Sequence, residues 1–231
     1  MSVVAIVQCR VGSSRLPGKA LRVLSGETMV RHVLRRVASL GYEVVVATSL
    51  SQRDDLLAEM VRDYGYRVFR GSEWDVLSRV AGAVEAIEAE SVIRVTADCP
   101  LWAPDVARRV VDRYVASGAR GIVTNDTTVS GWADGLDVEI FSAALLAQAA
   151  RYATERADRE HVTPWIRRHA PHVVVGSSED WRRVKLSVDT LDDFERVRDV
   201  MANVNGGGYG WAATRAALVK MNLNAWSGGE S

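Results

Sequence analysis

Short runs of apolar residues alternate with stretches of helical periodicity along the first half of the chain. Residues 3–7 form a continuous, largely β-branched run, which is typical of a strand covered on both faces of a sheet. After Thr28, apolar residues recur at helical spacing over residues 30–37, and they predict an amphipathic helix that ends near Gly41. The chain is therefore predicted to open with a strand followed by a helix.

The same alternation continues to residue 125. Further strands are predicted from apolar runs at residues 43–48, 66–69, 91–98 and 121–125. Helical patterns fill the intervals at residues 51–64, 75–90 and 104–117. Strands that alternate with helices in this way indicate an α/β fold with a mainly parallel sheet and helices on both faces.

The pattern changes after Asn125. Further strands are predicted at residues 136–141, 172–175 and 184–188. Further helices are predicted at residues 143–152, 158–171, 190–201 and 211–220. A glycine-rich loop is expected at residues 205–210 and a frayed end at residues 227–231. We expect one domain over residues 1–231, in which residues 125–172 form a small insertion.

Composition narrows the possible classes of function. Of the 231 residues, 48% are hydrophobic and 25% charged, which is ordinary for a globular domain. Lys and Arg together number 29, as do Asp and Glu, so the formal net charge is zero. A general nucleic-acid or membrane-surface binder would need a basic excess, so neither partner is expected. One local basic pocket remains compatible with this balance.

The two cysteines and the N-terminus bear on location. Cys9 and Cys99 both follow apolar runs without metal-ligand spacing, which favours a reducing, cytoplasmic compartment. The first ten residues lack the basic and long apolar regions of a signal peptide. No run approaches the roughly 18 apolar residues of a membrane span. A cytoplasmic location is therefore predicted.

The first predicted strand leads into a segment rich in cations, QCRVGSSRLPGKAL, at residues 8–21. In an open parallel sheet, ligands bind beyond the carboxyl ends of the strands. Backbone N–H groups near Gly12 and the hydroxyls of Ser13 and Ser14 suit an anion, and Arg and Lys side chains add charge. The residues expected to bind a phosphate group are Arg10, Gly12, Ser13, Ser14, Arg15 and Lys19.

The match to known phosphate loops is loose. The segment is not G-x-x-x-x-G-K-[ST], because Ala20 follows Lys19, and it is not G-x-G-x-x-G. The alternative interpretation is a solvated loop with a few salt bridges.

Two aspartates stand where predicted strands end. Asp98 ends the run at residues 91–98, and Asp189 follows the run at residues 184–188. Two carboxylates at one sheet edge suit Mg²⁺, which takes one or two carboxylates together with phosphate and water oxygens. Alternatively, Asp98 is a turn residue and Asp189 belongs to the cap of the helix after Thr190.

Several blocks together resemble the cytidylyltransferases named for spore coat polysaccharide biosynthesis. After the opening segment come RVTADCPL (residues 94–101), GLDVEIF (135–141), REHVTPWI (159–166) and LSVDTLDDF (186–194), in the order of that family. The family is related to acylneuraminate, pseudaminate and ketodeoxyoctulosonate cytidylyltransferases. The resemblance covers residues 3–201. It departs at Cys9, where an alanine is usual, and at the WAD before Gly135, where a proline and a basic residue are common.

The resemblance implies a three-layer, Rossmann-like fold of the nucleotide-diphospho-sugar transferase type and a Mg²⁺-dependent reaction. CMP passes from CTP to a sugar, sugar acid or similar polar acceptor, and pyrophosphate leaves. It implies catalytic roles for Arg15, Lys19 and Asp98, and metal binding by Asp98 and Asp189. Positioning and electrostatics would carry most of the catalysis.

Further contacts are predicted on either side of this centre. Nucleotide or acceptor contacts are expected from the segment after the third strand, at Ser72, Asp75 and Arg79, although Asp75 equally suits a helix cap. Within residues 125–172, Asp137 and Glu139 are expected to hold acceptor hydroxyls or a second metal. The resemblance implies that Glu160 and His161 line the acceptor side of the cleft or the subunit interface. Alternatively, Asp137 and Glu139 lie on the wet face of a strand. His161 is also a candidate general base.

Two other functions remain open from the sequence: a guanylyl- or uridylyltransferase acting on a sugar phosphate, and a non-catalytic nucleotide-binding protein of the same fold. A homodimer built through residues 125–172 is also predicted, because that segment carries Trp132 and Trp165 and aromatic residues are enriched in interface cores.

Overall fold

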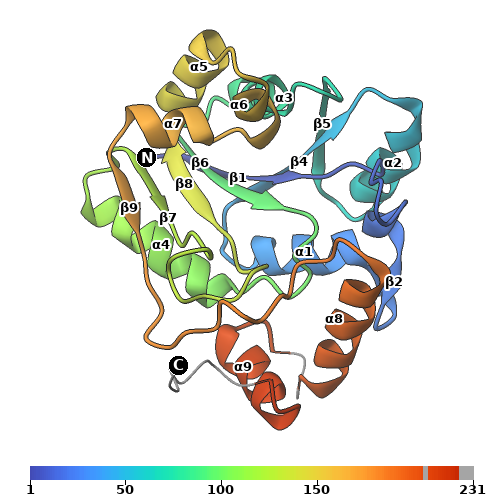
Figure 1. Cartoon of the computed structure of the whole chain (residues 1–231). Coiled ribbons are helices and arrows are strands. Elements are labelled where there is room, and N and C mark those ends of the chain that lie inside the picture. Colours follow the sequence, from blue (N-terminus) through green and yellow to red (C-terminus); the bar gives the residue numbers. More distant parts are fainter. Residues whose placement is uncertain (205–207, 224–231) are drawn as a thin grey trace.

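The computed structural model describes residues 1–204 and 208–223, and it arranges them in three layers around one large sheet (Figure 1). The strands lie in the order β5-β4-β1-β6-β8-β7-β9. Their bounds are β1 Val3–Gln8, β4 Glu43–Ser49, β5 Arg67–Gly71, β6 Ser91–Thr96, β7 Ile122–Thr124, β8 Glu139–Ser142 and β9 His172–Val174. Among the strands of this sheet that the structure describes, only β8 runs antiparallel to its neighbours, β6 and β7. The predicted α/β architecture with a mainly parallel sheet is confirmed.

Apolar side chains on alternate strand positions pack against helices on both faces of the sheet. One core joins the sheet to α1 Met29–Ala38, α2 Asp55–Asp63 and α4 Pro104–Ala116. A second core joins the opposite face to α3 Val76–Glu85, α5 Ala143–Tyr152 and the segment of α6 Arg156–His161 and α7 Pro164–His169. Figure 1 shows this second group above the sheet.

A third apolar cluster lies beyond the sheet, under α8 Leu191–Asn203 and α9 Trp211–Lys220. Trp132, Trp181 and Trp211 meet there edge to face, with ring centroids 6.0 and 5.3 Å apart. The prediction that Trp132 belongs to a dimer interface is therefore wrong, because this side chain is buried within the chain itself. The cluster holds the segment before Asp189 against the rest of the domain.

Two small elements complete the fold. A hairpin pairs β2 Val23–Leu24 with β3 Glu27–Thr28, and it was not predicted. Short 3₁₀ turns cover η1 Lys19–Leu21 and η2 Gln52–Asp54. Within the described ranges, no helix is long and apolar enough to cross a membrane.

Helix boundaries follow the predicted capping residues closely. The Ser142 side chain accepts a hydrogen bond from the backbone N–H of Leu145 at the start of α5. Thr190 and Asp193 form a reciprocal capping box at the start of α8. Part of the predicted glycine-rich loop, and the predicted frayed end, lie outside the described residues.

Three predictions in the second half of the chain are corrected. Residues 184–188 are not a strand, because their only ladder contact is a single bridge from Lys185 to Asp134. The strand predicted at residues 136–141 begins only at Glu139. The helix predicted at residues 158–171 is two short helices, because Val162 between them has a φ of 73°.

The segment at residues 125–172 is more than an addition to the sheet. It contributes β8, an inner strand between β6 and β7, so the sheet is incomplete without it. Its three helices α5, α6 and α7 cover one face beside α3 (Figure 1).

Candidate active site

The carboxyl ends of β1 and β6 meet at the centre of the sheet. The two strands are parallel neighbours, and Gln8 at the end of β1 is in register with Thr96 at the end of β6. The loop after β1 therefore lies beside Asp98, although 79 residues separate Lys19 from Asp98. A cavity of about 370 Å³ opens at this point. We call it the loop cavity.

The loop after β1 is held in a compact turn by its own backbone. The N–H of Gly18 donates to the carbonyl oxygen of Val11, and the N–H of Leu16 donates to the Ser13 hydroxyl. Asp54, which is buried, accepts from the N–H of Val11 at 2.7 Å. Gly18 has a φ of 70°, a conformation that favours glycine. This turn presents Lys19 to the cavity.

Lys19 joins the two aspartates. Its Nζ lies 3.1 Å from Asp98 Oδ2, 3.2 Å from Asp189 Oδ1 and 2.7 Å from the carbonyl oxygen of Val188. Arg15 reaches the same Asp189 Oδ1 at 3.0 Å. The structure thus brings together four groups that the sequence predicts for one centre. Two cations from the opening loop face two carboxylates from distant parts of the chain.

Charge pairing sets the ionisation of these groups. Burial alone would lower the pKa of Lys19, but Asp98 and Asp189 outweigh it and leave the pKa above its ordinary value. Burial alone would raise the pKa of Asp189, but Lys19 and Lys185 hold it below its ordinary value. Both groups therefore stay charged near neutral pH.

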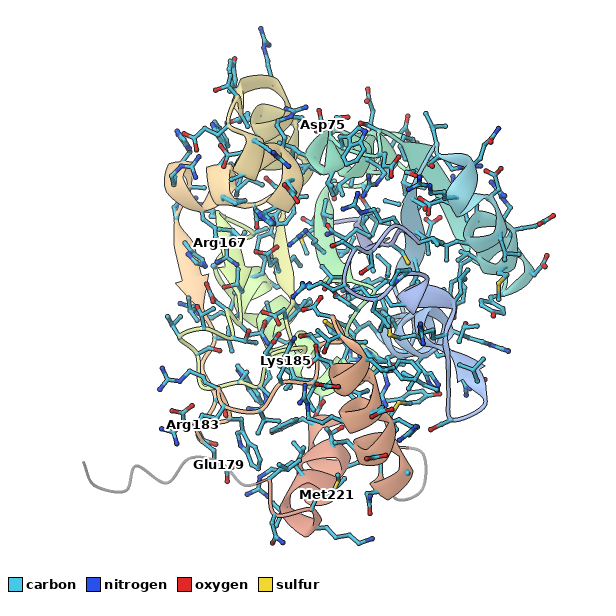
Figure 2. All side chains as sticks on the ribbon, turned by 45° about the vertical axis from the view of Figure 1, so that its right-hand side comes forward. Asp75, Arg167, Glu179, Arg183, Lys185 and Met221 are labelled. Carbon is cyan, nitrogen blue, oxygen red and sulfur yellow. The ribbon has the colours of Figure 1, made fainter. Side chains whose placement is uncertain are left out.

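Lys185 supports Asp189 from the other side. Lys185 lies in the loop before α8 (Figure 2). Its Nζ lies 3.2 Å from Asp189 Oδ2 and 2.7 Å from Asp193 Oδ2. The backbone N–H of Asp189 also donates to Asp193. This arrangement fixes the Asp189 carboxylate, and a role for Lys185 was not predicted from the sequence.

Two further arginines line the loop cavity without a carboxylate in hydrogen-bond contact. Arg10 is half-buried and has no hydrogen-bond or ion-pair partner within residues 1–204 and 208–223. Arg79 is buried and donates to the carbonyl oxygen of Ser72 at 2.5 Å, while its Nε has no hydrogen-bond partner. Burial lowers the pKa of Arg79. An uncompensated buried cation is costly, so this cavity suits an anionic ligand.

The remaining residues predicted to contact the nucleotide separate into two groups. Gly12, Ser13, Ser14 and Arg79 line the loop cavity with the groups described above. Ser72 and Asp75 do not line it. Asp75, which Figure 2 labels, instead caps α3. It accepts from the N–H of Ser78 and pairs with Arg159. For Asp75, the helix-cap interpretation describes its contacts.

A second cavity of about 420 Å³ adjoins the first, and the two share Thr96 and His161 in their linings. We call it the β8 cavity. Asp137, Glu139 and His161 all line it, whereas Glu160 lines the loop cavity. His161 is exposed, and its ring has no partner in the described part of the chain. His161 therefore lies where the two cavities meet.

The buried Glu139 carboxylate joins two arginines. It lies 2.5 Å from Arg94 Nη1 and 2.6 Å from Arg167 Nη2, and it accepts from the Thr163 hydroxyl at 2.9 Å. Burial alone would raise the pKa of Glu139, but Arg94 and Arg167 hold it below its ordinary value. Arg167 also lies 2.6 Å from Asp126. Figure 2 shows Arg167 beside the sheet on α7.

Asp137 lies in the same cavity without an arginine partner. Its carboxylate accepts from the Thr127 hydroxyl at 2.8 Å and from the N–H of Gly135 at 3.1 Å. Burial raises its pKa above the ordinary value. Asp137 precedes β8, so it reaches the cavity from a loop and not from the strand face that the sequence suggested.

Arg94, Asp126 and Arg167 were not predicted from the sequence. Arg94 offered a signal, since it is the one charged residue within the apolar run of β6. Asp126 and Arg167 offered none, because their pairing spans 41 residues and depends on how α7 crosses β8.

Comparisons with known proteins agree with one another. The cytidylyltransferase family matches residues 4–202 of this chain. The spore coat polysaccharide biosynthesis protein SpsF of Bacillus subtilis (strain 168) is 32% identical over 208 residues, 85% of this chain and 85% of that protein.

Two solved structures have the same fold. A cytidylyltransferase from Leptospira borgpetersenii serovar Hardjo-bovis (strain JB197) matches with a TM-score of 0.89 and 25% identity, over 100% of this chain and 99% of the other. A CMP:2-keto-3-deoxy-manno-octonic acid synthetase complexed with CTP matches with a TM-score of 0.68, over 87% of this chain and 99% of the other. Its 17% identity makes it a likeness of fold alone.

Proposed function

Because this chain belongs to the cytidylyltransferase family, we propose that it transfers CMP from CTP to a polar acceptor of the sugar or sugar-acid class. An acceptor oxygen bonds to the α-phosphorus, the bond from that phosphorus to the bridging oxygen breaks, and pyrophosphate leaves. One observation carries the proposal. The cations of the loop after β1 face Asp98 and Asp189 across a single cavity that also holds the unpaired Arg10 and the buried Arg79.

In this proposal the loop cavity holds the nucleotide. Arg10, Arg15, Lys19 and Arg79 neutralise the triphosphate, and backbone and hydroxyl donors from Gly12, Ser13 and Ser14 surround it. The charge that gathers on the departing pyrophosphate is stabilised by Arg15 and Lys19. Removing one such donor is expected to cost about 10²–10³ in rate.

The two aspartates fit a divalent cation. They already share one cation, because the Lys19 ammonium lies within 3.2 Å of both carboxylates. In the described part of the chain, no three His, Cys, Asp or Glu side chains form a cage for a metal. Two carboxylates that need phosphate and water to complete the ligand set are typical of Mg²⁺. Asp98 and Asp189 would hold this ion, which would offset the negative charge of the phosphates.

The acceptor is proposed to lie in the β8 cavity. Asp137, Glu139 and His161 line it, and His161 reaches the boundary where an acceptor oxygen would meet the α-phosphorus. Glu160 lines the loop cavity and pairs with Arg156 on the surface of α6. Ser72 and Asp75 are proposed to act indirectly. They belong to the loop that Arg79 holds in place by donating to the carbonyl oxygen of Ser72.

The nucleotide can be tested by its effect on thermal unfolding. A ligand that binds only the folded state at about 100 times its Kd stabilises it by about 2.7 kcal/mol. With Mg²⁺ present, CTP is expected to raise the Tm more than GTP, UTP or ATP. Pyrophosphate release from CTP across a panel of acceptors then tests turnover. A preference for GTP or UTP would replace the proposal, and tight CTP binding without turnover on any acceptor would favour a non-catalytic role.

We also propose a cytoplasmic homodimer. Both cysteines are buried and free, which is usual in a reducing compartment where CTP is available. On the outer surface of residues 125–172, the exposed Tyr152 stacks near Trp165, and Trp165 stacks on His169 at 4.1 Å. Exposed aromatic groups of this kind suit the core of an interface.

A further inference from the structure

The β8 cavity has an unusual balance of charge for a site that would receive a sugar acid. Its charged lining consists of two guanidinium groups, from Arg94 and Arg167, and three carboxylates, from Asp126, Asp137 and Glu139. The carboxylates outnumber the guanidinium groups by one. An entering acceptor therefore meets a lining that is neutral or acidic, in contrast to the loop cavity with its unpaired Arg10.

Both guanidinium groups are already engaged. Arg94 donates from Nε to the Gln8 side chain at 2.9 Å and from Nη1 to Glu139 at 2.5 Å. Arg167 donates from Nη1 to Asp126 at 2.6 Å and from Nε and Nη2 to Glu139 at 3.2 and 2.6 Å. All three nitrogens of Arg167 and two of the three of Arg94 therefore have partners, and Arg167 offers no free pair of nitrogens to an acceptor carboxylate.

The buried ion pair of Glu139 and Arg94 cannot easily change partners. The side chains of Glu139 and Arg94 are 7% and 13% exposed, so breaking their pair would leave a buried charge without a partner. Asp126 is the more accessible partner, at 18% exposure, and it blocks the remaining Nη1 of Arg167. A carboxylate on the acceptor would have to displace Asp126 to reach Arg167 Nη1, and it would lie near three like charges.

The remaining groups suit hydroxyls. The carboxylate of Asp137 has only neutral donors around it, a hydroxyl and a backbone N–H, so it keeps lone pairs for a sugar hydroxyl. Thr96 and Thr124 add hydroxyl groups to the same lining. Carboxylates and hydroxyls accept hydrogen bonds from an uncharged polyol, whereas the carboxylates repel an anion.

We propose that the acceptor presents an uncharged, hydroxyl-bearing body to the β8 cavity, as a neutral sugar or polyol does, and that Asp126 excludes sugar acids from it. This inference rests on the proposed function. Any phosphate on such an acceptor lies at its nucleophilic end, toward the loop cavity and its arginines. Asp126 acts here as a specificity-determining residue through Arg167.

Binding of a sugar acid tests this inference directly. The probe is 2-keto-3-deoxy-manno-octonic acid, titrated calorimetrically in the presence of Mg²⁺ and a CTP analogue that cannot be cleaved at the α-phosphorus. Asp126→Asn keeps the shape of the side chain and removes its charge, so Arg167 Nη1 keeps at most a neutral partner, which an acceptor carboxylate can displace. Because a charge-assisted hydrogen bond is then available, the variant is expected to bind the probe about tenfold more tightly than the wild type or better.

The matched control is Asp180→Asn, which removes a carboxylate from a pair with Arg182 at the surface, away from either cavity. Its affinity for the probe is expected to equal that of the wild type. Asp126→Ser provides a second variant if Asp126→Asn lowers the Tm. A turnover assay compares the sugar acid with mannose and mannose 1-phosphate, two acceptors whose sugar ring carries no carboxylate.

The outcomes separate the two proposals. If the CTP analogue fails to bind any of the variants or the wild type, the proposed function itself is wrong. If the analogue binds and the wild type takes the sugar acid as well as Asp126→Asn does, only the present inference is overturned. The inference would also be overturned if the wild type turned over the sugar acid faster than it turned over both mannose and mannose 1-phosphate.

Discussion

At the scale of single residues, the ammonium group of Lys19 lies between two carboxylates that suit a divalent cation. Its contacts of 3.1 and 3.2 Å with Asp98 and Asp189 offset the repulsion between these carboxylates when no nucleotide is bound. A triphosphate would draw the same ammonium toward itself and leave the carboxylates available. Binding of nucleotide and binding of metal should therefore favour each other.

Lys19→Met is expected to separate these two effects. Without nucleotide, the variant should bind Mn²⁺ more tightly than the wild type, because two carboxylates lose their internal cation. With CTP, its kcat/KM should fall about 10²–10³-fold, because the triphosphate loses a donor. Titration of Mn²⁺ by electron paramagnetic resonance, together with pyrophosphate release, measures both.

Lys185→Met is the matched control, since Lys185 contacts Asp189 and Asp193 but not Asp98. It should change Mn²⁺ binding less than Lys19→Met does. If Lys19→Met bound Mn²⁺ no more tightly than the wild type does, Lys19 would not be the internal cation that competes with the metal for these carboxylates.

At the scale of elements, one glycine positions the segment that carries Asp189. Gly135 has a φ of 99°, and a Cβ there would lie 2.5 Å from the backbone nitrogen of Ser187 and 2.6 Å from the carbonyl carbon of Leu186. The loop before β8 thus packs directly on the backbone that leads to Val188, whose carbonyl oxygen accepts from Lys19. Backbone atoms cannot move aside as a flexible side chain can.

Gly135→Ala is therefore expected to destabilise the fold by about 3 kcal/mol or more, from backbone strain together with overpacking. Gly118→Ala is the control, because Gly118 has a φ of 72° and a Cβ at that position would meet nothing within 4 Å. It should lose only about 1 kcal/mol from strain. Urea unfolding measures both losses, and equal losses would show that the close approach at Gly135 does not matter.

Some of the elements could be predicted from the local sequence, and others could not. Capping residues such as Ser142 and Thr190 act locally, so the helices they begin were predicted at the correct residue. Residues 184–188 have the alternation of a strand, yet they stay outside the ladder because the segment facing them, near Asp134, is a loop. Strand pairing is a long-range property, and a local pattern cannot specify the partner.

At the scale of the whole molecule, the predicted meeting of Lys19 with Asp98 follows from topology, whereas Asp189 comes from a segment that is not a strand and that packs in the third apolar cluster. Parallel strands carry their carboxyl ends to one edge, so residues just after β1 and β6 become neighbours wherever they lie in the sequence. The β8 cavity was only partly predictable from the sequence. Its arginine network depends on the antiparallel β8 and on a helix that crosses it, and no rule of strand order places them.

The proposed homodimer is tested at this scale. Tyr152 is 56% exposed on α5 and belongs to the aromatic group of residues 125–172, whereas Leu56 is equally exposed at 56% on α2. We expect a dimer in sedimentation at micromolar concentration. Tyr152→Glu should produce a monomer, because burying a charge in an interface core is costly, and Leu56→Glu should remain a dimer. A monomeric wild type would contradict the proposal, and dissociation by Leu56→Glu but not by Tyr152→Glu would move the interface to α2.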